Sequence, residues 1–384
     1  MIATDTRIYN VSGQYYADNA FVPILERYCA GFNNLALCAR IYKISSPPEF
    51  CREITGLAVS YVGFNRLLDA LSYKGRKEIR KAVRSCDLVI ARVPSVIAYQ
   101  AANAARSQKK PYLAEAMACA WDGYLNHSLI GKLAAPYMFL KMRCVVYNAD
   151  FATYVTESFL QKRYPCKNRS TGVSNVKIEE MEEDALKKRM EKIGRMERDN
   201  INLMTAGGVN VRAKGQQYVI RAIKRLAAEG INVTYCLAGK GDQSYLRKLA
   251  SRQGVSDNVV FLGGVSRGRV FELLDLTDIY IQPSKQEGLP RAVIEAMSRG
   301  CPVLGANTGG IPELLQKECI FKRGSVNSVV AAVKSMLRSD MAKYASENFE
   351  NAKKYRESIL NEKRTGYYAY VSDKCRERAE AREV

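Results

Sequence analysis

Two glutamates, Glu287 and Glu295, are the side chains best placed in this sequence to act together on one small ligand. Glu287 lies in a predicted loop, and a helix is predicted to begin at Pro290, because proline is favoured at the first helical position. Glu295 then falls about one turn inside that helix. This arrangement can present two carboxylates to a polyhydroxylated ligand, while free amides at the helix start bind an anion. The competing interpretation is that both acids only complement the helix dipole.

Three glycine-containing turns offer contacts for a phosphate group. The first begins at Gly208 and ends with Arg212 and Lys214, which combines close backbone approach with positive charge, although a solvated basic turn has the same composition. The second, residues 239–242, lacks the third glycine of a dinucleotide-binding fingerprint and is interpreted as a simple turn. The third contains Thr308 and Gly309 and precedes a short helix with a proline near its start.

These residues depend on strands and helices that the sequence pattern also predicts. Residues 201–315 alternate between the two, with strands over 201–206, 232–238, 258–262, 279–282 and 302–305. Helices are predicted over 215–229, 245–253, 270–275 and from 290. This order predicts a doubly wound α/β domain, in which ligands bind at the carboxyl ends of the strands.

A similar but weaker alternation precedes it and predicts a second domain with a parallel sheet. Strands are expected over residues 6–11, 35–41, 87–92 and 112–116, and helices over 21–32 and 74–85. Residues 177–200 carry mixed charge and are interpreted as a solvated helix or hinge that ends at the domain boundary. The predicted organisation is therefore residues 1–200, residues 201–344 and C-terminal helices over 345–384.

Composition narrows the class of protein. The 384 residues carry a formal charge of +20, which suggests an anionic partner. Nucleic acid is one candidate, but no recognition motif accompanies the charge, and a phosphorylated substrate or an anionic membrane surface fits equally well. Eleven cysteines without a C-x-x-C pair and a single histidine argue against a disulfide framework or a structural metal. No apolar stretch has the length of a membrane span and no signal peptide is evident, so a cytoplasmic location is expected.

The C-terminal motifs together resemble family 4 retaining glycosyltransferases, which have the GT-B fold of two Rossmann-like domains facing across a cleft. The resemblance covers residues 201–340, and it implies that the C-terminal helices over 345–384 cross back onto the first domain. It rests on motifs in family order, namely Gly208 to Gly215, residues 237–241, 260–263, 281–284, 287–297, 300–303 and 309–313. Residues 154–165 more loosely resemble capsule and exopolysaccharide transferases.

This resemblance assigns roles to the residues of the C-terminal domain. Glu287 would bind hydroxyls of the donor sugar and Lys214 the diphosphate, and we take these two as the catalytic residues. Glu295 would accept hydrogen bonds from the ribose of the nucleotide. The remaining donor contacts would come from Gly288, Leu289, Arg212, Gly208, Thr308 and Gly309. Lys214 and helix-start amides would stabilise the leaving nucleoside diphosphate without a metal, and a donor phosphate oxygen would take the acceptor's proton.

Two places depart from the family pattern. Val209 stands where the family usually has an arginine that binds the diphosphate. His127 lies somewhat later than the histidine that family members often carry near the sugar. His127 is therefore one of several candidates for contacting the acceptor, together with Gly13, Glu115 and Asp122.

The predicted function is transfer of a sugar from a nucleotide-sugar donor, UDP-linked, to a polysaccharide or lipid-linked oligosaccharide. No cofactor beyond this co-substrate, no metal and no nucleic acid is expected. Basic residues between Lys74 and Arg84 recur at helical spacing and suggest contact with an anionic membrane, or a plain solvated face. The apolar run 133–140 is assigned to the core in preference to a lipid contact. Three alternatives remain: a transferase for a small soluble acceptor, a catalytically silent GT-B nucleotide- or partner-binding protein, and a Rossmann oxidoreductase.

Overall fold

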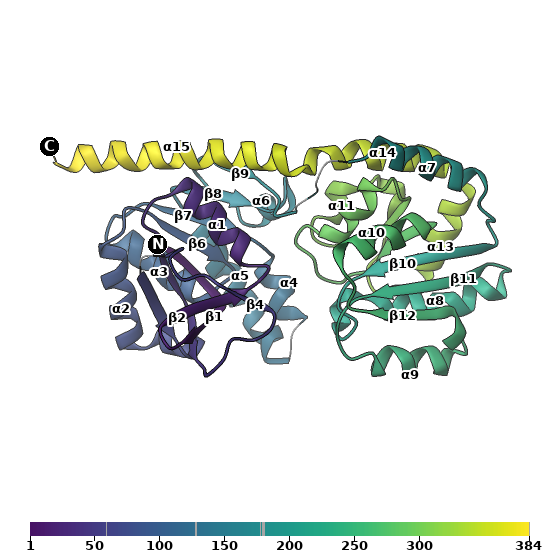
Figure 1. Ribbon diagram of the computed structural model, residues 1–384, viewed down its shortest axis with the longest axis horizontal. Coiled ribbons are helices and arrows are strands. Elements are labelled where there is room, and N and C mark those ends of the chain that lie inside the picture. Colours follow the sequence, from purple (N-terminus) through teal and green to yellow (C-terminus); the bar gives the residue numbers. More distant parts are fainter. Residues whose placement is uncertain (59, 127–128, 177, 179–180, 384) are drawn as a thin grey trace. The chain divides into compact units, whose positions relative to one another are not determined.

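The computed structural model describes residues 1–58, 60–126, 129–176, 178 and 181–383, and the chain divides into two compact units. Unit 1 consists of residues 1–173 and 361–384, and unit 2 of residues 174–360. Each unit is built on its own largely or wholly parallel sheet with helices on both faces (Figure 1). The predicted α/β class and the two Rossmann-like domains are thereby confirmed.

The sheet of unit 1 is organised around its first strand, β1. The early residues of β1 pair in parallel with β6, its last residues pair in antiparallel with β2, and β3 lies along its other side. A parallel series continues from β6 through β7 and β8 to β9. The strands are β1 Ile2–Val11, β2 Gln14–Asp18, β3 Ala36–Lys43, β4 Cys51–Glu53, β5 Ser60–Phe64, β6 Val89–Val93, β7 Tyr112–Ala116, β8 Phe151–Tyr154 and β9 Ser170–Gly172.

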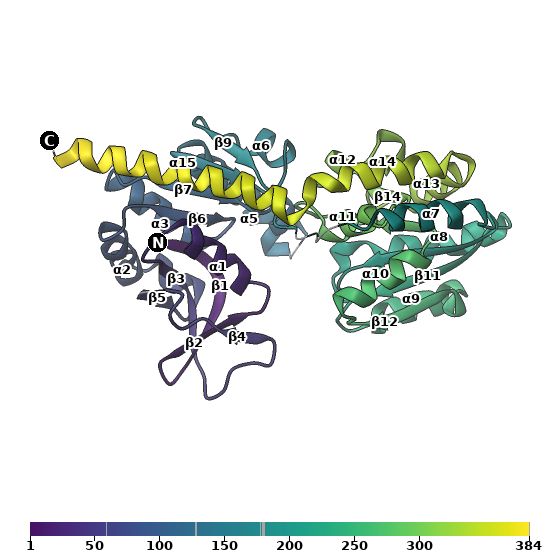
Figure 2. The ribbon, with the colours of Figure 1, turned by 45° about the horizontal axis from the view of Figure 1, so that its top comes forward.

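Helices cover the two faces of this sheet and bury separate apolar clusters. One cluster lies beneath α2, α3 and α5, and the other beneath α1 and the C-terminal helix α15, which runs along the unit (Figure 2). Tyr28 of α1 and Tyr368 of α15 stack there with ring centroids 6.0 Å apart. The helices are α1 Val22–Gly31, η1 Leu67–Leu71, α2 Tyr73–Arg84, α3 Val96–Ser107, α4 Ala120–Leu125, α5 Leu129–Tyr147, α6 Phe159–Arg163 and α15 Glu357–Glu383, of which residues 357–360 belong to unit 2.

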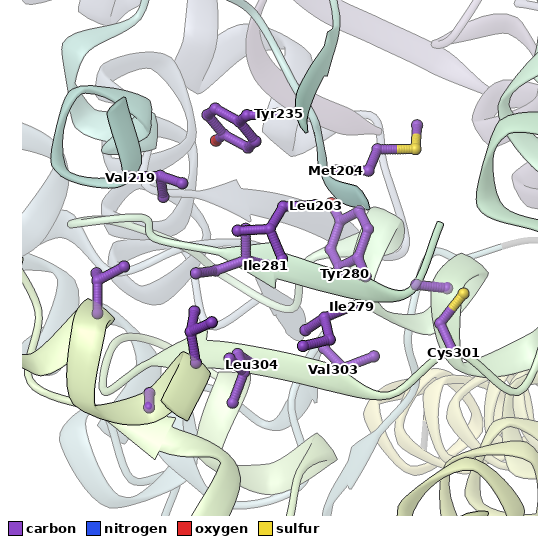
Figure 3. Close-up of a cluster of buried hydrophobic side chains, with 14 of the residues drawn as sticks. Leu203, Met204, Val219, Tyr235, Ile279, Tyr280, Ile281, Cys301, Val303 and Leu304 are labelled. Atoms are coloured by element: carbon purple, nitrogen blue, oxygen red, sulfur yellow. The ribbon is translucent and has the colours of Figure 1, made fainter. Parts of the chain in front are cut away.

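The sheet of unit 2 is parallel throughout, in the order β12-β11-β10-β13-β14-β15. Its strands are nearly continuous apolar runs because helices cover both faces. Figure 3 shows Leu203, Tyr280 and Val303 from three of these strands in one buried cluster. The strands are β10 Asn200–Ala206, β11 Asn232–Ala238, β12 Val259–Gly263, β13 Ile279–Gln282, β14 Val303–Ala306 and β15 Ile320–Phe321.

The helices of unit 2 follow the predicted positions closely up to residue 314. They are α7 Glu183–Gly194, η2 Arg212–Lys214, α8 Gln216–Ala228, α9 Ser244–Gln253, η3 Ser256–Asn258, α10 Arg267–Leu276, α11 Arg291–Ser298, α12 Ile311–Leu314, η4 Lys317–Cys319, α13 Val326–Arg338, α14 Met341–Ala352 and η5 Lys353–Tyr355. The helix predicted from Pro290 begins one residue later, with Pro290 as its cap.

The division between the units falls after Val173, whereas the sequence analysis placed the boundary at residue 200. The reason is Arg189 of α7, whose buried guanidinium donates to the carbonyls of Leu274 and Thr277 at the end of α10 and of Arg299 after α11. A cation at the negative ends of two helices fixes α7 to unit 2. The charged segment is therefore anchored to unit 2 by buried Arg189, with Ala185 also buried and Lys192 paired with Asp278, although most of its side chains face solvent.

Candidate functional site

The strand order of unit 2 reverses between β10 and β13, and this is where an open parallel sheet leaves a crevice for a ligand. The loop after β10 and the loop after β13 meet at this point, joined by a hydrogen bond from the Lys285 amide to the Ala213 carbonyl at 2.7 Å. Gly215 permits the contact. It has a φ of +77°, and a Cβ there would lie 1.9 Å from the carbonyl oxygen of Pro283.

Lys214 and Glu287, the two residues predicted to be catalytic, come together across these loops. The Lys214 ammonium donates to Oε1 of Glu287 at 2.7 Å, and Ser284 Oγ and Gln282 Nε2 donate to the same oxygen at 2.6 and 3.0 Å. The second carboxylate oxygen, Oε2, accepts no hydrogen bond from the residues that the structure describes. The carboxylate is therefore held by one oxygen and has the other available for a ligand.

A buried polar network behind Glu287 fixes its position. Tyr280 donates to Oε1 of Gln282 at 2.7 Å, which orients the amide nitrogen of Gln282 toward Ser284 and Glu287. Burial raises the pKa of Tyr280 well above its usual value, so the phenol keeps its proton and remains a donor. Gln282 and Ser284 were not among the predicted site residues. The signal that could have identified them is their place directly at the carboxyl end of a buried strand.

Glu295 lies inside α11 and is more shielded than a surface glutamate, with 18% of its side chain exposed. Its nearest cation is Arg267, whose Nε is 4.0 Å from Oε1. Burial raises the pKa of Glu295 above its usual value, and Arg267 and Arg291 oppose this shift. Within the described part of the chain the Glu295 carboxylate is thus poor in hydrogen-bond donors for its degree of burial, and hydroxyl groups of a ligand would supply them.

The loop with Thr308 and Gly309 supports the loop of Glu287. A Cβ at Gly309, which has a φ of +56°, would lie 2.3 Å from the Glu287 carbonyl oxygen. The Gly310 amide donates to the Gly288 carbonyl at 2.6 Å, and Thr308 Oγ1 donates to the Lys285 carbonyl at 3.3 Å. The glycine at 309 is required by this close packing. Gly288 is tied down through its carbonyl, and Leu289 packs against the core of unit 2.

In the basic turn after Gly208, some side chains are buried in the core and others are exposed at the surface. Val209 is 3% exposed and belongs to the apolar core of unit 2. Position 209, where the resembling family usually has an arginine, therefore faces inward in this chain. Arg212 is exposed and its guanidinium stacks over the ring of Tyr245 at 4.4 Å. Lys214 is consequently the basic side chain of this turn that contacts Glu287.

The acceptor-side candidates lie in unit 1, and those that the structure describes form no single cluster of interacting side chains. Glu115 is buried and forms an ion pair with Arg92 at 3.2 Å, and Tyr28 donates to the same carboxylate. Asp122 is buried and pairs with Arg163 at 3.0 Å. Gly13 has a φ of +94° in the two-residue turn between β1 and β2, with open space around it. His127 lies outside the described residues.

Unit 1 also contains a cavity that the sequence analysis did not anticipate. It has a volume of about 560 Å³ and lies at the carboxyl ends of β6 and β7, with Asp5, Asp18, Arg92, Ser95 and Met117 among its lining residues. A larger hollow of about 710 Å³ lies between α8 and α13, lined by surface side chains such as Arg225 and Lys334. We favour the smaller one as a ligand site, because it lies at strand ends. Among the described residues no cluster of His, Cys, Asp and Glu could hold a metal ion.

Comparison with known proteins relates the chain to glycosyltransferases. Residues 187–355 match the family described as "Glycosyl transferases group 1". Protein CapJ of Staphylococcus aureus is 29% identical over 364 residues, which cover 91% of this chain and 88% of CapJ. A GDP-mannose-dependent alpha-(1-6)-phosphatidylinositol monomannoside mannosyltransferase of Mycobacterium tuberculosis is 31% identical, but over only 32% of this chain and 35% of its own.

Solved structures resemble both units. Sucrose-phosphate synthase from Thermosynechococcus elongatus superposes with a TM-score of 0.66 at 15% identity, covering 97% of this chain and 98% of that one. The Anabaena protein HepE in complex with UDP-glucose superposes with a TM-score of 0.61 at 17% identity, covering 96% and 99%. At such low identity these likenesses establish the fold.

Proposed function

Residues 187–355 of this chain form a group 1 glycosyltransferase domain within a GT-B fold, and we propose that the protein transfers a sugar from a UDP-linked donor, with retention at the anomeric carbon. The proposed acceptor is a polysaccharide or a lipid-linked oligosaccharide. The observation that carries the proposal is the Lys214–Glu287 pair at the reversal point of the unit 2 sheet, with one carboxylate oxygen left for a ligand.

The donor would bind along the loops that meet at this pair. Oε2 of Glu287 accepts from hydroxyls of the sugar, and Glu295 accepts from hydroxyls of the ribose. The ammonium of Lys214 has three protons, so it can keep its bond to Glu287 and donate to the diphosphate as well. Arg212, Gly208, Thr308, Gly309 and the amides of Gly288 and Leu289 are the further donor contacts in this proposal.

The proposed reaction needs no protein base. The bond between the anomeric carbon and the diphosphate oxygen breaks, and the acceptor oxygen forms a bond to the same carbon on the same face. The acceptor's proton passes to a phosphate oxygen of the departing nucleoside diphosphate. Lys214 stabilises the negative charge that develops on that group, and it is already positioned before the reaction begins.

The choice of UDP and of a glycan acceptor rests on relatives. HepE was solved with UDP-glucose, which supports a UDP-linked donor here. The near full-length match to CapJ, together with the resemblance of residues 154–165 to capsule transferases, supports a surface polysaccharide as the acceptor. We assign acceptor binding to unit 1 and to its cavity beside Arg92. Direct contact with the acceptor by Glu115 or Asp122 would require their ion pairs to open.

A thermal-shift screen with UDP-, GDP-, ADP- and dTDP-sugars tests the donor site. We expect UDP-sugars to stabilise the wild type, and Glu295→Ala to lose most of that stabilisation. Glu272→Ala is a matched control, because Glu272 is a surface glutamate of the same unit with 63% of its side chain exposed. If none of the nucleotide sugars stabilises the wild type, the proposed function is wrong.

A second experiment separates an active enzyme from a silent nucleotide-binding protein, the alternative that the inward-facing Val209 favours. The protein is incubated with the UDP-sugar that binds best, and release of UDP is followed in water and with glycan acceptors. We expect slow hydrolysis in water and faster release with an acceptor. Donor binding without UDP release under any condition would support the silent protein.

A further inference from the structure

Helix α5 of unit 1 carries a row of large apolar side chains that face solvent. Six of them are between 49% and 84% exposed, and we call them the α5 stripe: Leu129, Ile130, Leu133, Tyr137, Leu140 and Tyr147. At 3.6 residues per turn these positions fall on one side of the helix along its whole length. The sequence analysis assigned residues 133–140 to the core, and this is wrong for Leu133, Tyr137 and Leu140.

The opposite side of α5 explains why the stripe stays exposed. Met138, Met142, Val145 and Val146 are buried in the apolar cluster that α5 shares with α3 and the sheet. The helix thus has two apolar sides, and only one of them is covered by unit 1. A side chain of the stripe cannot turn inward without displacing this packing. An exposed apolar row of this length marks a surface that binds a membrane or another protein.

The charges on α5 indicate which of these two partners the stripe binds. The helix contains no aspartate or glutamate, and its basic residues border the stripe, with Lys132 and Arg143 on one side and Lys141 on the other. Helix α2 covers the same face of the sheet and exposes its own row of lysines and arginines. A second copy of the chain would bring like charges together, whereas an anionic surface complements them.

We propose that the α5 stripe docks on an anionic lipid bilayer, with the stripe inserted among the acyl chains and its basic borders at the headgroups. No helix among the described residues is long and apolar enough to cross a bilayer, so α5 would lie in the plane of the interface. This inference concerns where the protein works. It does not depend on the chemistry proposed for unit 2, although it would bring the active site to a lipid-linked acceptor.

Flotation with vesicles tests the proposal on the full chain. Vesicles of phosphatidylcholine with phosphatidylglycerol should carry the wild type upward, and pure phosphatidylcholine vesicles should carry much less. The double variant Leu133→Ser, Leu140→Ser should bind roughly tenfold more weakly because it removes two inserted side chains. Lys132→Glu with Arg143→Glu should weaken binding only to the anionic vesicles. Leu276→Ser, at an exposed leucine of unit 2, is the matched control and should bind like the wild type.

Two results would overturn the proposal. In one, the leucine variants bind anionic vesicles as well as the wild type does, even if charge reversal on α2 abolishes binding. In the other, light scattering shows that the wild type is a dimer that the leucine variants dissociate, while neither binds vesicles, which would assign the stripe to a second copy. Stabilisation by a UDP-sugar is measured on the same variants and should be unchanged, so a failure here is distinct from a failure of the proposed function.

Discussion

The ammonium nitrogen of Lys214 lies 2.7 Å from Oε1 of Glu287, although the two residues are 73 positions apart in the chain. They approach because β10 and β13 are neighbours in the sheet and their following loops leave it at the same edge. The Glu287 side chain is 9% exposed and that of Lys214 is 28% exposed, so the pair is sheltered but reachable. A sheltered ion pair with one unused carboxylate oxygen provides a fixed cation and an acceptor before any ligand arrives.

Lys214→Met and Glu287→Gln should each lower kcat/KM for sugar transfer by about 10²-fold or more, because each removes a preorganised partner of the transferred group. The kcat/KM of the double variant should be only slightly below that of the less active single variant, because the effects of residues that act as a unit are not additive. Steady-state kinetics with a UDP-sugar give these values. Lys334→Met and Glu229→Gln break a surface ion pair of the same type in unit 2 and should change kcat/KM little. If the double variant loses as much kcat/KM as the product of the two single fold-losses, Lys214 and Glu287 act independently.

Glu295→Gln should make the ligand-free protein more stable at neutral pH while weakening UDP binding roughly tenfold. The folded-state pKa of Glu295 is raised above its unfolded value by burial. Its contribution to stability is therefore fully present below the unfolded pKa and is lost as the pH rises through the folded pKa. The glutamine keeps the shape without the charge, so the melting temperature should lose this part of its pH dependence. Thermal unfolding across pH, with and without UDP, measures both effects, and a less stable glutamine variant at pH 7 would contradict the assignment.

Val209→Arg should unfold unit 2 instead of adding a phosphate ligand, with a loss of about 3 kcal/mol or more of folding free energy. Val209 is 3% exposed, and an arginine there would place an unpaired charge in the core. Val211→Arg is the matched control, because Val211 lies in the same turn and is 45% exposed. Chemical denaturation of both variants gives the comparison. Wild-type stability of Val209→Arg together with tighter UDP binding would mean that the new side chain reaches the phosphate.

Gly309→Ala should reduce donor affinity more than its effect on stability explains. The added Cβ would lie 2.3 Å from the Glu287 carbonyl oxygen, so the loop that carries Glu287 must move. Gly254→Ala introduces a similar backbone strain at a φ of +69°, but nothing lies within 4 Å of its Cβ. Gly254→Ala should lose about 1 kcal/mol of stability because of its positive φ. Gly309→Ala should lose more, because its added Cβ also clashes with the loop of Glu287. Calorimetric titration with UDP should show a weaker Kd for Gly309→Ala alone, and equal Kd values would remove Gly309 from the site.

The elements of the fold were largely predictable. The strands at 232–238 and 279–282 and the strand at 112–116 coincide with β11, β13 and β7, because apolar runs bounded by turn residues are local patterns. The helix after Pro290 was displaced by only one residue, since proline sets where a helix can begin. Helix α13 was not predicted, although residues 326–338 bury a regular apolar face. The unit boundary was misplaced because α7 is held to unit 2 by a few inward-facing contacts, chiefly those of Arg189, which a segment so rich in charge does not reveal.

Local sequence patterns specify the kinds of elements, the glycine turns and the residues that resemble a glycosyltransferase donor site, because each depends on neighbours along the chain. Tertiary packing brings Lys214 to Glu287, pairs Glu115 with Arg92 and turns Val209 toward the core. It also turned one apolar side of α5 toward solvent. These contacts depend on the strand order and on whether each side chain points toward the core or toward solvent. Both are fixed by contacts between residues far apart in the chain.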